Sequence, residues 1–343
     1  MTHGEREFAL PQWVFAQSTY AFIDQHQILC QYCSNDSKAK AGSTLAILST
    51  SAEPSLNIIE TPWQDFSSIA AGGKQLAFIA ASCQNFPQLI SAELKNNYEL
   101  DHRLIKTSCQ IPVPEEYFSC AQPLTFTNRH QQQVHANYYP PTNPDCQADD
   151  NSQPPLIVIC HGGPTGQAGL ALDPRKQFWT SRGFALLDVN YSGSTGYGKD
   201  YRLRLDNKWG ELDVQDCCDA ALYAVERGLA NKEQLIIRGS SAGGYTVLSA
   251  LTFEEVFSAG ASYYGISELC TLATGTHKFE ARYLDRLIGP YPEDKVKYEQ
   301  RSPINHTEQL NCPVIFFQGV EDKVVPKQQA EEMFNALDEK GVT

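Results

Sequence analysis

The chain has 343 residues, of which 42% are hydrophobic and 20% are charged, a composition typical of folded proteins that argues against a disordered chain. The formal net charge of -13 argues against nucleic acid and against an anionic membrane as the partner, because both would repel an acidic surface. The length predicts two domains, and no stretch approaches the roughly 20 apolar residues of a membrane-spanning helix.

The N-terminal residues contain no apolar stretch of the kind that a secretory signal needs. We therefore expect a cytoplasmic protein whose eleven cysteines are reduced thiols. Cys30 and Cys33 have Cys-x-x-Cys spacing, but residues three apart in a strand face opposite sides of the sheet. Zinc or redox chemistry is not expected there, and the sequence predicts neither a metal nor a cofactor.

Residues 1–122 predict part of a β-propeller. Turn residues such as Gly72-Gly73 separate short expected strands at 13–23, 28–32, 45–49, 56–59, 66–70, 76–80 and 89–94. The similar strands that begin at Leu45 and Leu89 lie about one propeller blade apart, a period of roughly 40–50 residues. Because a closed propeller needs about four to eight blades, these residues have room for about two.

Residues 123–343 predict an α/β domain. Strand-like segments at 124–126 and 134–139 precede a loop at 140–155 that is rich in Pro, Asn and Asp. Strands expected at 156–160, 185–190, 235–237, 259–263 and 313–318 then alternate with helices expected at 176–182, 212–227, 245–251 and 327–340. This alternation predicts a mainly parallel sheet with helices on both faces, and chemistry beyond the carboxyl ends of its strands.

Residues 235–246 have the pattern of a nucleophile elbow: an apolar strand, then Gly-Ser-Ser-Ala-Gly at 239–243, then a helix. The glycines at 239 and 243 lack the Cβ atoms that would clash at such a sharp turn. The pattern predicts Ser241 as a nucleophile, with the amide of Ala242 facing the carbonyl oxygen that it attacks.

Two further loops follow strand ends. The loop His161-Gly162-Gly163-Pro164 could supply a second backbone donor to that oxygen, and a simple glycine turn is the alternative. Asp322, after strand 313–318, could orient an imidazole. Glu321 is the adjacent alternative to Asp322, and a non-catalytic Asx turn is the other.

Hydrolases with this elbow place the acid after the serine and the histidine last. All eight histidines precede Asp322, so we expect the general base to lie outside these residues and the chain to be catalytically incomplete. His161 belongs to the glycine loop and should point away from Ser241, while the position of His277 is not fixed by any pattern.

The chain resembles the prolyl oligopeptidase family of serine peptidases, most closely its acylaminoacyl-peptidase and dipeptidyl-peptidase-like branch. The matching stretches are HGGP at 161–164, NYSGSTGYG at 190–198, WG at 209–210, GSSAGG at 239–244, RSP at 301–303 and QGVEDKVVP at 318–326. The resemblance implies an α/β-hydrolase domain preceded by the last blades of a β-propeller, with both ends of the family pattern missing.

By position, the resemblance implies that Ser241 is the nucleophile and Asp322 the acid, with the Gly163 and Ala242 amides as the oxyanion hole. Tyr263 and Tyr264 fall where relatives build the substrate pocket, and core packing is the alternative reading. The glycine-rich run at 193–198 lacks the Gly-Lys-Ser/Thr of a phosphate loop. The resemblance implies that this run is a structural loop.

The main hypothesis is a serine peptidase that cleaves short peptides through an acyl-enzyme. The alternatives are a catalytically incomplete fragment and a carboxylesterase. The expected partner is a peptide substrate, without nucleic acid or membrane. A homo-oligomer is possible, because two isolated blades would expose strand edges and apolar faces.

Overall fold

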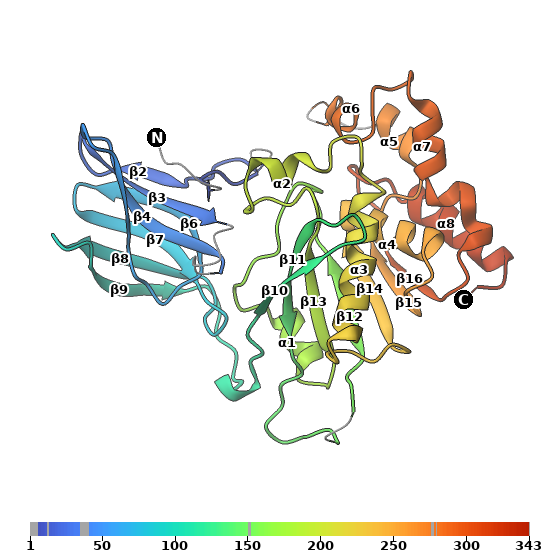
Figure 1. Ribbon diagram of the computed structural model, residues 1–343, viewed down its shortest axis with the longest axis horizontal. Coiled ribbons are helices and arrows are strands. Elements are labelled where there is room, and N and C mark those ends of the chain that lie inside the picture. The colour runs from blue at the N-terminus through green and yellow to red at the C-terminus, as the bar shows by residue number, and fades with distance from the viewer. Residues whose placement is uncertain are drawn as a thin grey trace.

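The computed structural model describes residues 6–11, 14–34, 41–149, 152–275, 278 and 280–342. Trp13, where the first expected strand begins, and His277 lie outside these residues. The described residues form two small antiparallel sheets and one seven-stranded sheet (Figure 1). The two small sheets lie together, beside the large sheet and its helices.

The first small sheet is five-stranded and antiparallel. Its strands are β1 (Arg6–Glu7), β2 (Tyr20–Phe22), β3 (Gln27–Ser34), β4 (Ser43–Ser49) and β5 (Ser55–Ile58). The strand expected at 13–23 is shorter than predicted, because a turn in which Ala16 has a positive φ precedes β2.

The second small sheet is four-stranded, in the order β6 (Asp65–Gly72), β7 (Gln75–Ala81), β8 (Gln88–Leu94) and β9 (Leu100–Thr107). Leu45 and Leu89 fall in β4 and β8, which hold the same place in their two sheets and so support the blade repeat. Side chains from both sheets, Ile47 and Phe78 among them, pack in one core. The prediction omitted β9, an edge strand with almost every side chain exposed.

The large sheet confirms the predicted α/β class. Its order is β10-β11-β13-β12-β14-β15-β16, and all pairs from β13 to β16 are parallel. The strands are β10 (Gln122–Thr127), β11 (Gln133–Tyr139), β12 (Leu156–Cys160), β13 (Ala185–Asn190), β14 (Leu235–Ser240), β15 (Ala259–Tyr263) and β16 (Val314–Phe317).

Helices cover both faces of this sheet. The helices α3 (Leu212–Glu226), α4 (Ala242–Phe253) and α8 (Gln328–Glu339) share one core with the buried side chains of the strands. On the other face, α1 (Pro174–Thr180) contributes Trp179 to a smaller cluster. Short helices that the sequence did not predict are η1 (Glu115–Tyr117), α2 (Lys199–Leu203), α5 (Leu269–Gly275), α6 (Tyr283–Leu287), α7 (Lys295–Arg301) and η2 (Pro303–Gln309).

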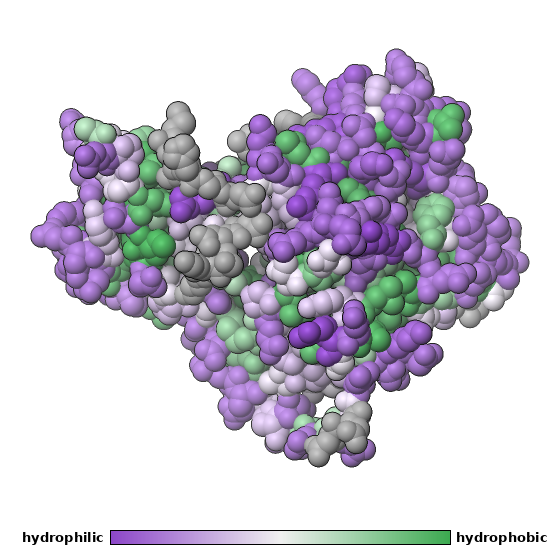
Figure 2. All heavy atoms as spheres, viewed as in Figure 1, coloured by the Kyte–Doolittle hydropathy of each residue, from purple (hydrophilic) through white to green (hydrophobic). Residues whose placement is uncertain are grey.

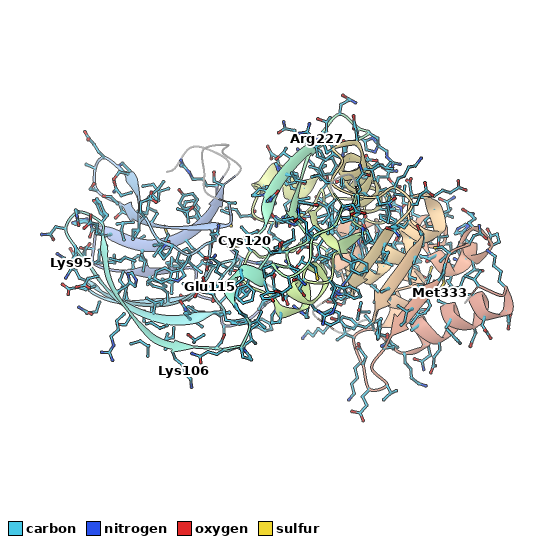
Figure 3. The ribbon with its side chains drawn as sticks, turned by 90° about the horizontal axis from the view of Figure 1, so that it is seen from below. Lys95, Lys106, Glu115, Cys120, Arg227 and Met333 are labelled. Carbon is cyan, nitrogen blue, oxygen red and sulfur yellow. A yellow bond between two sulfur atoms is a disulfide. The ribbon has the colours of Figure 1, made fainter. Side chains whose placement is uncertain are left out.

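A disulfide joins the second blade to the segment that enters the large sheet. Cys83, just after β7, is bonded to Cys120, just before β10, with 5.2 Å between their Cα atoms. Figure 3 labels Cys120 between the blades and the large sheet. The expectation that every cysteine is a reduced thiol is wrong for this pair, because pairing depends on proximity in space that the sequence does not reveal. The other cysteines are free.

The first blade presents apolar side chains to solvent. Phe15 is 72% exposed and Phe22 is 65% exposed, and Val14 and Tyr20 are exposed beside them in the sequence. Figure 2 shows hydrophobic side chains interrupting the hydrophilic surface over both parts of the chain. Within the described residues, no helix has the length and apolar character needed to cross a membrane.

Candidate active site

Ser241 lies at the sharp turn between β14 and α4. Its backbone has φ 55° and ψ -122°, a conformation that residues other than glycine rarely adopt. The Ser241 amide donates to the carbonyl of Tyr263 at 2.9 Å, and its own carbonyl accepts from Tyr245 at 3.1 Å, which begins the helix. The chain therefore has the strand, strained turn and helix that the sequence predicts.

The glycines beside the turn allow backbone segments to approach each other. A Cβ atom on Gly239 would clash with the carbonyl oxygen of Gly243, and one on Gly243 would clash with that of Cys160. Cys160 is the last residue of β12, so these two glycines allow the elbow to pack against the end of the neighbouring strand.

The loop at 161–164 runs beside Ser241. A Cβ atom on Gly162 would lie 3.1 Å from the carbonyl oxygen of Ser240 and 3.6 Å from Cβ of Ser241. Gly163 has φ 125°, in the region that favours glycine. Gly163, Ser241 and Ala242 line the same small cavity, so the structure brings these three predicted residues together.

His161 turns away from the serine, as expected. Its Nε2 atom lies 2.7 Å from the Ser194 hydroxyl, and its ring stacks on Tyr191 with 4.2 Å between ring centres. Burial lowers the pKa of His161 below its usual value. This histidine is therefore a partly buried part of the loop that contacts Ser194 and Tyr191.

Asp322 lies beyond the carboxyl end of β16, on the sheet edge that also carries Ser241. Its Oδ1 atom accepts hydrogen bonds from the amides of Val324 at 2.9 Å and Val325 at 3.0 Å. These are the contacts of the Asx-turn alternative, and they leave Oδ2 available to another group. Glu321 is exposed.

The small cavity at Ser241 has a volume of about 40 Å³, and its walls combine apolar side chains with the polar groups of Glu280 and Tyr283. The sequence did not predict its apolar side chains, which are Trp209, Ile266, Leu272, Leu284, Val324 and Val325. Two signals pointed towards them, because Trp209 lies in the WG stretch and the two valines belong to the QGVEDKVVP stretch that also holds Asp322.

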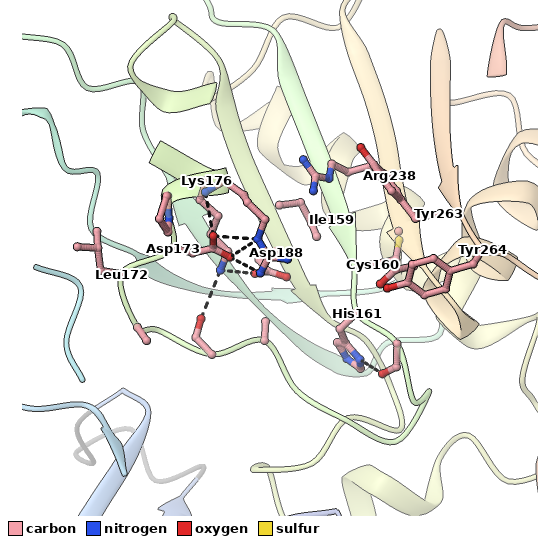
Figure 4. A pocket seen from close by; sticks show the side chains of 18 of the residues that line it. Ile159, Cys160, His161, Leu172, Asp173, Lys176, Asp188, Arg238, Tyr263 and Tyr264 are labelled. Atoms are coloured by element: carbon pink, nitrogen blue, oxygen red, sulfur yellow. Dashed lines mark hydrogen bonds and ion pairs between the residues drawn. The ribbon is translucent and has the colours of Figure 1, made fainter. Parts of the chain in front are cut away.

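Tyr263 and Tyr264 line a different cavity, of about 840 Å³, which also reaches Gly162 and Ser240 (Figure 4). On β15, Ser262 faces α4, so its neighbour Tyr263 points to the opposite face of the sheet. There the ring stacks on Phe317 with 4.5 Å between ring centres. Figure 4 also shows the buried ion pair between Lys176 and Asp188, 2.6 Å apart, on the wall of this cavity.

A buried carboxyl group lies behind the small cavity. Asp213 on α3 is fully buried and accepts hydrogen bonds from the Gly210 amide and the Thr246 hydroxyl, both at 2.6 Å. Burial raises the pKa of Asp213 to about 6. Because Gly210 adjoins Trp209 in the cavity wall and Thr246 is on α4, Asp213 links the wall to the helix that follows Ser241.

Within the described parts of the chain, no histidine hydrogen-bonds to Ser241 or to Asp322. His277 lies outside those parts. The described residues also contain no group of three or more His, Cys, Asp or Glu side chains that could hold a metal ion.

A strained serine between a strand and a helix, on a mostly parallel sheet, defines an α/β-hydrolase. The sequence pattern of the prolyl oligopeptidase family matches residues 171–343, about half of the chain. The chain belongs to the prolyl oligopeptidase family, and the resemblance noted from its motifs is confirmed.

Three known proteins show the extent of the similarity. Dipeptidyl aminopeptidase BIII of Pseudoxanthomonas mexicana is 32% identical over 206 residues, which cover 58% of this chain and 30% of that protein. The acylamino-acid-releasing enzyme of Arabidopsis thaliana is 32% identical over 197 residues, covering 55% of this chain and 26% of that protein.

The solved structure of a Mycobacterium tuberculosis puromycin-hydrolyzing peptidase is 35% identical, with a TM-score of 0.92. It matches 99% of this chain and 51% of its own. The chain thus spans about half of this solved relative and a smaller share of the two sequence relatives.

Proposed function

We propose that the protein is a serine peptidase that hydrolyses short peptides through an acyl-enzyme on Ser241. The observation that carries the proposal is that Ser241, in its strained turn, shares one cavity with Gly163 and Ala242. Relatives with 32–35% identity are peptidases by name, which favours peptides over esters.

In the proposed reaction, Ser241 Oγ attacks the scissile carbonyl carbon while a general base takes its proton. The carbonyl oxygen becomes an oxyanion, which accepts hydrogen bonds from the Gly163 and Ala242 amides. The tetrahedral intermediate expels the amine, which takes a proton from the protonated base. Water then hydrolyses the ester on Ser241 by the same steps and releases the acid.

Asp322 is proposed to hold the imidazole that acts as this base. Support comes from the parallel pairing of β14, β15 and β16, whose carboxyl ends share one edge of the sheet. Two backbone amides fix Asp322 Oδ1, so Oδ2 is available to accept from an imidazole N–H. Glu321 is a poorer candidate because it is exposed.

The cavity beside Ser241 is proposed to take the side chain that precedes the scissile bond. Its volume of about 40 Å³ and the six apolar side chains in its walls favour a small apolar side chain such as alanine. Tyr263 and Tyr264 are proposed to contact the substrate farther from the scissile bond, in the larger cavity that reaches Ser240.

A second candidate is that these 343 residues alone are catalytically incomplete. The observation that favours it is that no described histidine hydrogen-bonds to Ser241. Removal of one member of a triad leaves only about 10³–10⁴-fold catalysis over water.

The cytoplasmic location and the homo-oligomeric state also stay predictions.

A fluorophosphonate probe tests both candidates. The chain, Ser241→Ala and the matched control Ser240→Ala would be labelled with and without added imidazole, which can replace a missing base. A peptidase labels at Ser241 without imidazole and hydrolyses an alanyl anilide as well as the matching ester. Labelling only with imidazole identifies the incomplete site, and hydrolysis of the ester without any hydrolysis of the anilide identifies an esterase. Labelling at any other residue refutes the assignment of Ser241.

A further inference from the structure

The glycine-rich run at 190–198 lies against the loop that carries Gly163. The sequence marks this run only as a structural motif, yet its residues contact the loop at several points. It begins at Asn190, the last residue of β13, and Tyr191, Ser192 and Ser194 in it are fully buried. It is therefore a buried surface on which another loop can rest.

Tyr191 contacts both ends of the 161–164 loop. Its hydroxyl lies 2.9 Å from the carbonyl oxygen of His161 and 3.1 Å from that of Pro164, and can donate to either. Its ring also stacks on the imidazole of His161, at an angle of 16°. One side chain thus spans the two glycines between these carbonyls.

Ser194 holds the same histidine from its other side. Its hydroxyl lies 2.7 Å from His161 Nε2 and also donates to the carbonyl of Tyr191 at 2.7 Å. His161 Nδ1 lies 2.9 Å from the carbonyl oxygen of Gly162, the contact drawn as a dashed line in Figure 4. An imidazole with a single N–H can donate to only one of these two oxygens, so the ring is held by one N–H and by its stacked face.

Two more hydrogen bonds extend the contact along the chain. The amide of Thr195 donates to the carbonyl of Gly166, and the amide of Ala168 donates to Asn190 Oδ1, both at 2.8 Å. The run itself is held by α3, because Asp216 on that helix accepts a hydrogen bond from the Ser192 amide at 2.7 Å.

The 161–164 loop needs contacts from other residues to be rigid, because two of its four residues are glycines. Two consecutive glycines have wide conformational freedom, and Gly163 adopts a positive φ. A donor to an oxyanion must be fixed before the reaction, since reorientation during the reaction would cost part of its effect. The loop cannot supply that rigidity through its own side chains at 162 and 163.

We propose that Tyr191 and Ser194 are positioning residues, which hold the 161–164 loop at both ends and so fix the direction of the Gly163 amide. The inference rests on the proposed function only in assigning that amide to the oxyanion. The contact between the run and the loop can be tested without catalysis.

The experiment compares the unsubstituted chain with Tyr191→Phe, which keeps the stacked ring and removes the hydroxyl, and with Ser194→Ala. The control is Tyr138→Phe, which removes another buried tyrosine hydroxyl, one that donates to the carbonyl of Leu229 at 3.0 Å, away from the loop. Hydrogen exchange of the peptide covering residues 161–168, followed by mass spectrometry, reports loop rigidity. Circular dichroism confirms that each variant is folded.

Both test variants should exchange this peptide at least about tenfold faster, while Tyr138→Phe should leave it unchanged. Unchanged exchange in both test variants, or equal acceleration in the control, would overturn the proposal. In a chain that turns over substrate, kcat should fall about tenfold with KM unchanged, short of the roughly 10²–10³-fold loss of a whole donor. An unchanged kcat would also overturn it. A chain without any turnover counts against the proposed function, and the exchange rates still decide the positioning role.

Discussion

Replacing Asp213 with asparagine should change how the stability of the protein depends on pH. The folded chain buries this carboxyl group completely, and burial raises its pKa from 3.8 to about 6. Between these two values the folded state keeps a proton that the unfolded state has lost. The free energy of unfolding therefore falls as pH rises through this window.

The size of the effect follows from the shift. About two pKa units correspond to about 3 kcal/mol once the pH is above both values, and about 2 kcal/mol of this is lost between about pH 4.5 and about pH 7. Asparagine does not titrate and is nearly the same shape. Its amide can still accept from Gly210 and can donate to the Thr246 hydroxyl, in place of the contacts at 2.6 Å.

Urea unfolding followed by tryptophan fluorescence measures this difference. The stability of Asp213→Asn minus that of the unsubstituted chain should rise by about 2 kcal/mol from about pH 4.5 to about pH 7. Asp200→Asn, at an exposed aspartate, serves as the control. A difference for Asp213→Asn that stays constant within about 0.5 kcal/mol would refute a carboxyl group that burial keeps protonated.

The remaining predictions concern the disulfide, the elbow and the exposed blade. The double variant Cys83→Ser, Cys120→Ser should lower the free energy of unfolding by about 4 kcal/mol, because the disulfide closes a loop of 37-residue separation in the unfolded chain. Adding reductant to the unsubstituted chain should cause the same loss in thermal unfolding. Gly243→Ala should lower the free energy of unfolding by at least about 2 kcal/mol and abolish labelling of Ser241. Gly72→Ala, whose added Cβ atom meets no atom within 4 Å, should melt like the unsubstituted chain. The chain should self-associate through its exposed aromatic face, and Phe22→Ser should reduce this in size-exclusion chromatography with light scattering. A single monomer peak for the unsubstituted chain would contradict that last expectation.

Three strands of the large sheet, β12, β13 and β15, have the bounds expected from the sequence, whereas β14 was expected at 235–237 and extends to Ser240. β12 is a continuous apolar run that is buried almost throughout, as is typical of a strand covered on both faces. β9 could not be found this way. Its residues are nearly all exposed, so no alternation of apolar and polar side chains marks it, and only pairing with β8 makes it a strand.

The candidate site also has some residues that the sequence reveals and others that it does not. Ser241, Ala242 and Gly163 lie in short local motifs, which can be recognised in the sequence because their sharp turns require glycines. The structure brings these three residues into one cavity. Leu272 on α5 and Leu284 on α6 reach that cavity from segments far from Ser241 in the sequence. Their role depends on how helices pack, which no local pattern encodes. The pairing of the two disulfide-bonded cysteines is hidden for the same reason.

The absence of side chains at Gly239 and Gly243 has a mechanical consequence. The backbone at the end of β12 touches the turn that holds Ser241, and the next residues of the same strand become the loop that carries Gly163. A displacement of β12 therefore shifts Ser241 and Gly163 together, in the same direction. Thermal motion of the sheet should therefore change the positions of these two residues far more than the distance between them.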